Sequence, residues 1–330
     1  MLLLLSTPDD GHADAVAAVL AERAAPFVRW NQTGLAHEGS LSVAFTATAQ
    51  RGPELRVNGE RLALEEVNTV YMRRFVHVSV TRPIRDAAAR TYAANEATAA
   101  INAILRLPAV RWVPGTLSAV RDANDKLHQL QLAQSLGFEV PPTLLTSEPA
   151  ELWEFYREHE GHVIIKPLAF PWFESERGRW VASPQLLTPR DLVHAEGLRQ
   201  GAAILQAYVP KRVELRVTVV GDRVFPCEIH SQATNRTRVD WRRYNLNRTP
   251  HHVHPLPADV AAQCVAIVAR LGLSYGAMDL VLTPDGRYVF LEVNPMGQYL
   301  WIERITGMPI TEAICDLITM PTAHPAGART

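Results

Sequence analysis

Apolar and polar positions along the first hundred residues predict strands and helices in alternation. The apolar run Met1–Ser6 is typical of a buried strand, and the Ala-rich segment Asp86–Leu107 has the spacing of a long helix. The other elements expected here are a helix at Asp10–Ala25, strands at Phe27–Trp30, Leu41–Ala49 and Thr69–Arg74, and a hairpin turned at Asn58-Gly59. They predict a small α/β unit that ends where Trp112-Val113-Pro114-Gly115 breaks the pattern.

Two further mixed units are expected after this break. The middle unit takes a helix at Arg121–Leu136, a strand at Thr143–Thr146, a helix capped by Ser147 and a strand at His162–Pro167. The last unit takes two long antiparallel segments at Ile204–Val220 and Val224–His230, a helix at Asp259–Leu271 and a hairpin at Met278–Asn294. The predicted class is α/β (α+β), with units at 1–113, 114–203 and 204–330.

Composition and charge narrow the possible functions. Of 330 residues, 33 are Lys or Arg and 34 are Asp or Glu, so there is no overall basic field and a general nucleic-acid binder is not expected. Three cysteines, with no CxxC pair, favour reduced thiols in a cytoplasmic protein. Met1–Leu5 is too short for a signal or a membrane span, so we expect neither a targeting segment nor a membrane partner.

The segment from Ala277 to Asn294 carries the most chemical information. A two-residue turn at Asp285-Gly286 would place Asp279 directly opposite Glu292, with Asn294 on the same strand face. Two carboxylates and a carboxamide among apolar neighbours suit Mg²⁺, which prefers oxygen ligands and takes part of its shell from water and phosphate. The alternative is an ordinary hairpin whose acidic residues lie on a solvated face.

Two lysines, one at a strand end and one in a predicted helix, are candidates for binding phosphate. Lys166 ends the run Val163-Ile164-Ile165, and Lys126 stands in a predicted helix; each is also compatible with an ordinary surface position. In Val213–Val219 the side chains of Glu214, Arg216 and Thr218 share one face, which either lines a cleft or is simply half-solvated.

A cluster of arginines follows the second long segment of the last unit. Five arginines and few acids occur between His230 and Pro250, which favours either anion recognition or a solvated loop; the arginines are Arg236, Arg238, Arg242, Arg243 and Arg248. The nearby His251, His252 and His254 have no suitably spaced cysteine or acidic ligand, so zinc is not expected.

Taken together, these residues resemble the ATP-grasp carboxylate–amine ligases. The resemblance rests on ordered motifs over about residues 110–320: Asp125-Lys126-Leu127, Ile164-Ile165-Lys166-Pro167, Leu205-Gln206-Ala207-Tyr208-Val209, Glu214-Leu215-Arg216, Met278-Asp279-Leu280 and Leu291-Glu292-Val293-Asn294-Pro295. It implies an ATP-grasp fold, ATP and Mg²⁺ as cofactors, and Asp279, Glu292 and Asn294 as metal ligands. It also implies nucleotide binding by Lys126, Lys166, Gln206, Tyr208, Val209, Glu214 and Leu291.

Within that superfamily the chain resembles the graspetide, or microviridin-type, peptide maturases. The supporting segments are Tyr71-Met72-Arg73-Arg74, Trp112-Val113-Pro114, Asp240-Trp241-Arg242 and the run from Asn294 to Glu303. The resemblance implies catalytic roles for Arg216, Asp240 and Arg242, of which Arg242 would hold an acidic side chain of the core peptide. The stretch 168–178 departs from the glycine-rich phosphate loop of many ATP-grasp enzymes, since Gly178 is its only glycine; Phe170–Phe173 is a candidate lid.

The activity that this resemblance implies is peptide macrocyclisation. The enzyme would activate Asp or Glu side chains of a ribosomal precursor peptide as acyl phosphates and join them to Ser or Thr hydroxyls or Lys amines. Its partners would be the precursor's leader and acidic core, and a homodimer is expected. The alternatives are an ATP-grasp ligase for a small amino acid or a protein terminus, and a non-catalytic nucleotide-binding module.

Overall fold

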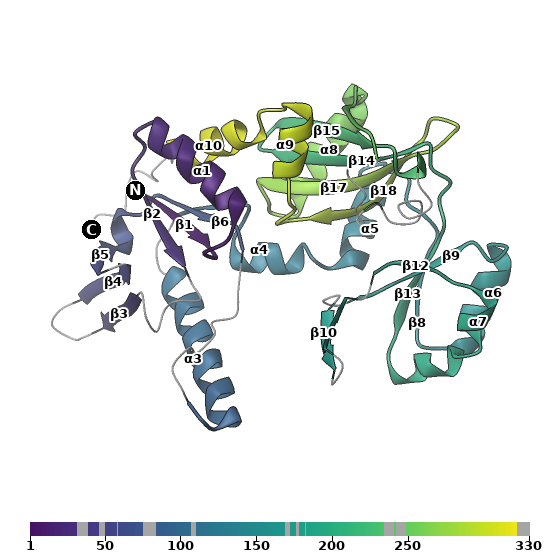
Figure 1. Cartoon of the computed structure of the whole chain (residues 1–330), viewed down its shortest axis with the longest axis horizontal. Helices are drawn as coiled ribbons and strands as arrows, with labels where there is room; N and C mark the ends of the chain where they lie inside the picture. The colour runs from purple at the N-terminus through teal and green to yellow at the C-terminus, as the bar shows by residue number, and fades with distance from the viewer. Residues whose placement is uncertain are drawn as a thin grey trace.

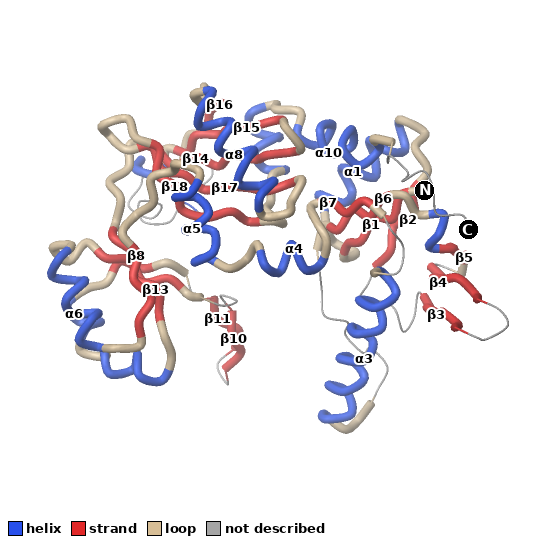
Figure 2. The backbone as a smooth tube through the Cα atoms, turned by 180° about the vertical axis from the view of Figure 1, so that it is seen from behind, coloured by secondary structure: helices blue, strands red, loops and turns tan. Residues whose placement is uncertain are grey.

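A computed structural model of the chain describes residues 1–31, 39–45, 50–57, 59–74, 84–106, 110–168, 172–175, 178–181, 183–233, 241 and 249–321. These residues form three groups of helices and strands, with the largest sheet between the N-terminal unit and a smaller sheet (Figures 1 and 2). The predicted mixed α/β class is confirmed. None of the helices in the described ranges is long and apolar enough to cross a membrane.

The N-terminal unit is built on a parallel sheet in the order β2-β1-β6-β7. Its first strand has every residue buried, as a parallel sheet covered on both faces requires. The strands are β1 (Leu2–Ser6), β2 (Phe27–Asn31), β6 (Thr69–Met72) and β7 (Arg111–Val113), with helices α1 (Gly11–Glu22) and α3 (Ala87–Leu105). A second, antiparallel sheet has β3 (Gly39–Phe45), β4 (Gln50–Val57) and β5 (Glu60–Ala63), with the 3₁₀ turn η2 (Leu64–Glu66).

The N-terminal unit contains the predicted hairpin and one strand that was not predicted. The hairpin predicted at Asn58-Gly59 joins β4 to β5, and Gly59 has a φ of +85°, although Asn58 lies outside the described residues. The break predicted at Trp112 is in fact strand β7, which extends the parallel sheet beside β6. A three-residue strand that ends at a proline has too little periodicity to be recognised from sequence.

The middle unit contains an antiparallel sheet in the order β12-β9-β13-β8. Residues Leu152 and Phe155 of its main helix pack with Val163 and Leu205 in a small separate core. The elements are α4 (Leu117–Asp122), α5 (Lys126–Ser135), β8 (Thr143–Thr146), α6 (Pro149–Glu158), β9 (Val163–Lys166), β12 (Gln185–Leu186), α7 (Pro189–Leu192), η3 (Ala195–Gln200) and β13 (Ala203–Ala207). A separate hairpin joins β10 (Trp172–Ser175) to β11 (Gly178–Val181).

The helix predicted at Arg121–Leu136 is two helices. Asp125 begins the second one, because its Oδ1 accepts hydrogen bonds from the backbone N–H groups of Leu127 and His128, at 2.9 and 3.1 Å. The predicted cap Ser147 is also wrong. The N-cap of α6 is Glu148, whose backbone N–H donates to Thr146 Oγ1 at 2.9 Å.

The largest sheet is antiparallel, in the order β16-β15-β14-β17-β18. One face of β14 presents Val213, Leu215, Val217 and Val219 to a core shared with helix α8. The elements are β14 (Val213–Val220), β15 (Arg223–Ile229), η4 (Ser231–Ala233), β16 (His251–Val253), α8 (Ala258–Arg270), β17 (Tyr275–Leu282), β18 (Tyr288–Asn294), α9 (Leu300–Thr306) and α10 (Ile310–Thr319).

The predicted single segment Ile204–Val220 is two strands in two different sheets. β13 pairs with β8 and β9, whereas β14 pairs with β15 and β17. Sequence alone did not show the crossing because both segments have strand character and only Tyr208–Arg212 separates them. The unit limits stay predictions, and we propose that the middle unit extends through Ala207.

The last helix ties the C-terminal unit to the N-terminal one. Helix α10 lies beside α1 (Figure 1), and Ile314 packs in the same core as Leu4 and Val16. On the exposed side of this contact, Arg23 Nη1 donates a hydrogen bond to Asp316 Oδ1 at 2.8 Å. Because the two units share a core, the carboxyl ends of β1 and β6 have a fixed position relative to the sheet that carries β17 and β18.

His12 belongs to this junction. Its ring lies 4.7 Å from that of Tyr299 in an edge-on arrangement. Burial, and next the charge of Arg73, lowers the pKa of His12 to about 4, while the charge of Asp10 opposes that shift.

Because His12 resists protonation in the fold, acid should destabilise the protein through this residue. The unfolded state takes up a proton below about pH 6.5 and the native state only below about pH 4, so stability is lost as pH falls through that window. We expect His12→Gln to remove this part of the pH dependence. Urea unfolding at pH 7.5, 6 and 4.5 measures it, and the exposed His162→Gln should follow the wild type. A wild-type slope in His12→Gln would contradict the assignment.

Candidate active site

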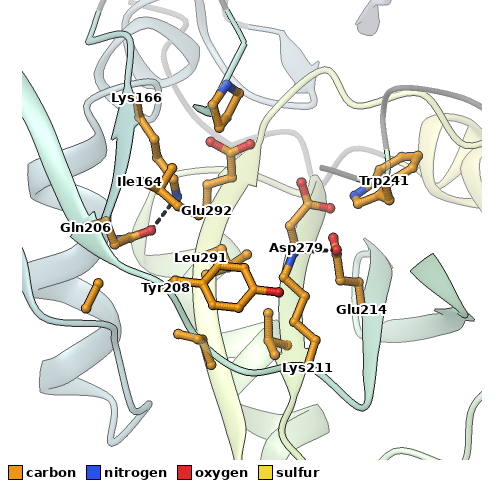
Figure 3. A pocket seen from close by; sticks show the side chains of 14 residues that line it. Ile164, Lys166, Gln206, Tyr208, Lys211, Glu214, Trp241, Asp279, Leu291 and Glu292 are labelled. Carbon is orange, nitrogen blue, oxygen red and sulfur yellow. Dashed lines mark hydrogen bonds and ion pairs between the residues drawn. The ribbon is translucent and has the colours of Figure 1, made fainter. Parts of the chain in front are cut away.

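A pocket lies between the sheet of the middle unit and the largest sheet (Figure 3). The space between the two sheets is about 540 Å³ with its open mouth included. Its polar lining residues are Lys166, Gln206, Tyr208, Lys211, Glu214, Asp279 and Glu292, and the others are Ile164, Pro184, Ala207, Val209, Trp241, Val281 and Leu291.

The acidic pair on the hairpin lies as predicted, although the turn does not. Asp279 pairs directly with Glu292. The turn has three residues instead of two, since the backbone N–H of Thr283 donates to Arg287 O at 3.0 Å and that of Gly286 donates to Thr283 O at 3.0 Å. Gly286 has a φ of +91°, as such a turn requires. Alone, this turn would shift the pairing by one residue.

A register shift between Asp279 and Leu280 restores the predicted pairing. Leu280 pairs with Phe290, whereas Asp279 pairs with Glu292, so Leu291 is an extra residue in β18. Regular alternation would turn Leu291 and Glu292 to opposite faces, but a β-bulge re-aims side chains locally. Both residues therefore line the same pocket.

Asp279 is buried beside a guanidinium. Arg216 Nη1 donates to Asp279 Oδ1 at 2.8 Å, and their side chains are 6% and 9% exposed. Burial disfavours the charged form of Arg216, but Asp279 outweighs this effect and the net pKa of Arg216 is raised. The Arg216 guanidinium also lies 5.7 Å from the ring centre of Trp241. Arg216 therefore stands behind Asp279, where it compensates the charge of that carboxylate.

A second buried ion pair lies on the pocket wall. Lys211 Nζ is 2.5 Å from Glu214 Oε1, and their side chains are 5% and 6% exposed. Ser231 Oγ donates to the same oxygen at 3.0 Å. Burial raises the pKa of Glu214, while the charge of Lys211 and its hydrogen bond oppose the rise. Lys211 was not predicted; its position three residues before Glu214 was the available signal.

The opposite wall carries Lys166, and the second lysine singled out in the sequence, Lys126, contacts the residue after it. Lys166 Nζ at the end of β9 donates to Gln206 Oε1 on β13, and Gln206 Nε2 donates to Thr143 Oγ1 at 3.0 Å. Lys126 Nζ, at the start of α5, donates to Pro167 O, the carbonyl just after Lys166. Lys166 and Gln206 line the pocket, whereas Lys126 is not among its lining residues.

Three described residues of the predicted site do not line the pocket: Lys126, Arg216 and Asn294. Arg216 lies behind Asp279, as described above. Asn294 is exposed and pairs with Ala277, and its Oδ1 accepts a hydrogen bond from the backbone N–H of Met296 at 3.1 Å. Asp240 and Arg242 lie outside the described residues, as does Phe170 of the candidate lid. Trp241 between them is described and buried, and it was missed as a lining residue.

The histidines near residue 252 have other partners. His254 Nδ1 is 2.8 Å from Glu228 Oε2, and its Nε2 is 2.9 Å from the hydroxyl of Tyr288. Both ring nitrogens are thus engaged within the protein. In the described ranges no group of three or more His, Cys, Asp or Glu is placed to hold a metal.

The donor set on the hairpin nevertheless fits Mg²⁺. A buried carboxylate at Asp279 faces a half-buried one at Glu292, and all their donor atoms are oxygen. Mg²⁺ is commonly bound by one or two carboxylates, with water and substrate phosphate completing its shell. The pocket beside them is lined by Lys166, which suits such phosphates.

Buried acid–base pairs make a sharp stability test. Removing one partner of a buried pair leaves an uncompensated charge, which typically costs about 3–5 kcal/mol. We therefore expect Lys211→Met to destabilise the protein strongly, and Lys211→Met/Glu214→Gln to recover most of the loss. Urea unfolding followed by tryptophan fluorescence measures both. A double variant as unstable as the single one would mean that packing, not charge, is responsible.

Comparison with known proteins gives the same assignment. No protein-family model and no curated protein matches the sequence. Among solved structures, macrocyclase MdnB from Microcystis aeruginosa MRC is 30% identical, with a TM-score of 0.79 over 97% of this chain and 99% of its own. MdnC from the same organism, solved with precursor peptide MdnA, is 26% identical, with a TM-score of 0.84 over 96% and 99% of the two chains.

A third structure shares the fold. The RiPP-associated ATP-grasp ligase of Chryseobacterium gregarium, solved with ADP and a leader and core peptide, is 24% identical with a TM-score of 0.88 over 96% of each chain. Another ligase of this fold, PsnB, holds Mg and ADP together in two solved complexes. Fold and pocket thus define an ATP-grasp ligase. More specifically, the chain belongs to the graspetide family of ATP-grasp peptide macrocyclases, as the sequence resemblance predicted.

Proposed function

We propose that this chain is an ATP-dependent macrocyclase that joins Asp or Glu side chains of a ribosomal precursor peptide to Ser or Thr hydroxyls or Lys amines. The observation that carries the proposal is the pairing of Asp279 with Glu292 on one wall of a pocket whose other wall presents Lys166 and Gln206. Carboxylates that face cationic and amide groups across a cleft suit a metal–triphosphate ligand.

The nucleotide would lie between the two sheets, and the cofactors are ATP and Mg²⁺. Ile164, Val209 and Leu291 supply apolar walls for a purine, and the backbone of Gln206–Val209 follows the same rim. Lys166, with Lys126 behind it, would hold the phosphates, and Glu214 would accept hydrogen bonds from the ribose. Asp279 and Glu292 would hold Mg²⁺, and Asn294 is proposed as a third ligand at the end of β18.

The reaction takes two steps, phosphoryl transfer and acyl transfer. A substrate carboxylate oxygen bonds to the γ-phosphorus of ATP as the bond to the β-phosphate oxygen breaks, giving an acyl phosphate and ADP. A hydroxyl or amine then attacks the acyl carbon, its proton leaves to solvent, and phosphate departs. Mg²⁺ supplies charge neutralisation at the phosphates when bound. The chain's own part is to orient both reactants and exclude water, because water would hydrolyse the acyl phosphate.

Recognition of the peptide is proposed for the arginine-rich segment after β15. The ring centres of the buried Trp241 and of Trp301 are 5.2 Å apart. Trp241 also lines the pocket, so this residue of the segment has a fixed position beside it. Its chain neighbours Asp240 and Arg242 would therefore act close to the reacting carboxylate. A guanidinium can hold a carboxylate in two parallel hydrogen bonds, as lysine cannot.

The proposal includes the compartment, the oligomeric state and the macromolecular partner of the enzyme. We propose that it works in the cytoplasm as a homodimer and that its macromolecular partner is a leader–core peptide. The near-zero net charge supports a peptide over a nucleic acid.

The carboxylates of the hairpin should be needed for metal-dependent turnover. We expect Glu292→Gln to lower ring formation about 100-fold or more at saturating ATP, since it removes a metal ligand and keeps the shape. Mass spectrometry should show the loss of one water per ring formed. Asp285→Asn changes the same charge in the exposed turn of the same hairpin and should behave as wild type. Wild-type activity in Glu292→Gln would refute the metal assignment.

Arg242 should separate peptide recognition from nucleotide binding. We expect Arg242→Ala to reduce ring formation about 100-fold while ADP still binds with wild-type affinity. Arg242→Lys keeps the charge without the two-pronged geometry, and we expect it to rescue little. Unchanged cyclisation by Arg242→Ala, or loss of ADP binding, would remove Arg242 from this role.

A further inference from the structure

A buried arginine lies outside the pocket, at the junction between the N-terminal unit and the largest sheet. Arg73 follows β6 directly, and its backbone N–H donates to Leu5 O at 2.9 Å, so it stands at the carboxyl end of the parallel sheet. Its side chain is only 4% exposed. A guanidinium so deeply buried is retained at a cost, which calls for a structural reason.

The contacts of Arg73 connect two units. Its Nε lies 3.7 Å from Asp10 Oδ1, an oxygen that also accepts the backbone N–H groups of His12 and Ala13 at the start of α1. Its Nη1 donates to Met296 O, 223 residues away, at 2.8 Å. Nε and Nη2 are buried and make no hydrogen bond. The hydrogen bond of this side chain therefore goes to the turn after β18.

That turn, Pro295–Gly297, is the backbone wall behind Arg216. A Cβ on Gly297 would lie 2.7 Å from Arg216 Nη2 and 2.2 Å from Ala277 Cβ, so backbone and guanidinium touch with no space between them. On its other side the turn is held by Tyr275, whose hydroxyl donates to Gly297 O at 2.6 Å. A shift of the turn must therefore move Arg216, and with it the charge that compensates Asp279.

We propose that Arg73 is a positioning residue for the metal site. It fixes the turn Pro295–Gly297 so that Arg216 keeps Asp279 oriented toward Glu292. The inference rests on the function proposed above, because it assigns Arg73 to the Mg²⁺ ligands of that site. Without Arg73 the carbonyl of Met296 loses a buried donor, and the turn has to rearrange to satisfy that carbonyl.

The next residue provides a matched control. Arg74 also faces Asp10, with Nε 3.3 Å from Oδ2, but its side chain is 48% exposed. A substitution there removes a cation beside the same carboxylate and leaves the contact with Met296 in place. Arg73→Met and Arg74→Met therefore differ mainly in the link to the turn.

The test measures metal binding and nucleotide binding separately. Calorimetric titration of Mg²⁺ into protein saturated with ADP gives the metal affinity, and ADP titration without Mg²⁺ gives the nucleotide affinity. We expect Arg73→Met to weaken Mg²⁺ binding about 10-fold, the size typical for residues that orient metal ligands, and to leave metal-free ADP binding within about 2-fold. Arg74→Met should stay within about 2-fold of wild type in both measurements.

Each other outcome has a definite meaning. Equal Mg²⁺ affinity in Arg73→Met and wild type, even with a lower melting temperature, overturns the inference and leaves only a structural role. An equal loss in Arg74→Met overturns it too, since the effect would then belong to Asp10. If Arg73→Met does not fold, Arg73→Lys replaces it: it keeps the charge, but its ammonium ends one bond short of the Nη1 position that donates to Met296 O, so wild-type Mg²⁺ affinity in that variant refutes the inference. A wild type that binds neither ADP nor Mg²⁺ refutes the proposed function instead.

Discussion

The site depends on keeping carboxylates ionised on a largely buried face of the sheet. Asp279 and Glu214 project from neighbouring strands β17 and β14 among apolar side chains, where an uncompensated negative charge would be neutralised by a proton. Arg216 and Lys211 oppose this, each within hydrogen-bond distance of its carboxylate. Burial still raises the pKa of Glu214, and the charge and hydrogen bond of Lys211 act against that rise. With Asp279 as the proposed metal ligand, its pair with Arg216 serves metal binding as well as stability, because a protonated carboxylate is a poor ligand for a cation.

The two compensated pairs differ in a way that matches their proposed uses. Arg216 reaches Asp279 through Nη1 and has its Nε buried without a hydrogen bond, so the pair is held by geometry and by the nearby Trp241 ring. Lys211 lies 5.7 Å from the ring centre of Tyr208 and reaches Glu214 with a buried ammonium. One cation thus lies behind the proposed metal ligand, and the other lines the pocket beside the carboxylate proposed to bind the ribose.

Local patterning predicted most elements, and the errors have identifiable causes. Asp10, Asp86 and Asp125 all cap helices, but a cap in the middle of a helical pattern, as at Asp125, is easily taken for an interior residue. The strand β7 is too short to show a period. The crossing between sheets at Tyr208–Arg212 was not found from the sequence, because the segments on either side both have strand character and the connection is only five residues long.

The acidic pair shows both the strength and the limit of such reasoning. The sequence predicted that Asp279 and Glu292 face each other, and this is confirmed. The two-residue turn from which the pairing was predicted is nevertheless absent. A three-residue turn and a bulge at Leu291 compensate each other in register. A bulge depends on packing on both sides of a strand, so periodicity cannot predict it.

The same bulge explains how one strand can serve both ends of a bound nucleotide. Leu291 and Glu292 are neighbours in sequence, and in a regular strand only one of them would reach the pocket. Here both line it, so an apolar wall and the proposed metal ligand come from adjacent residues of the same hairpin. Their separation is then fixed by covalent geometry instead of by a flexible loop. This placement requires the irregularity, because restoring regular pairing would turn either the apolar wall or the carboxylate away from the nucleotide.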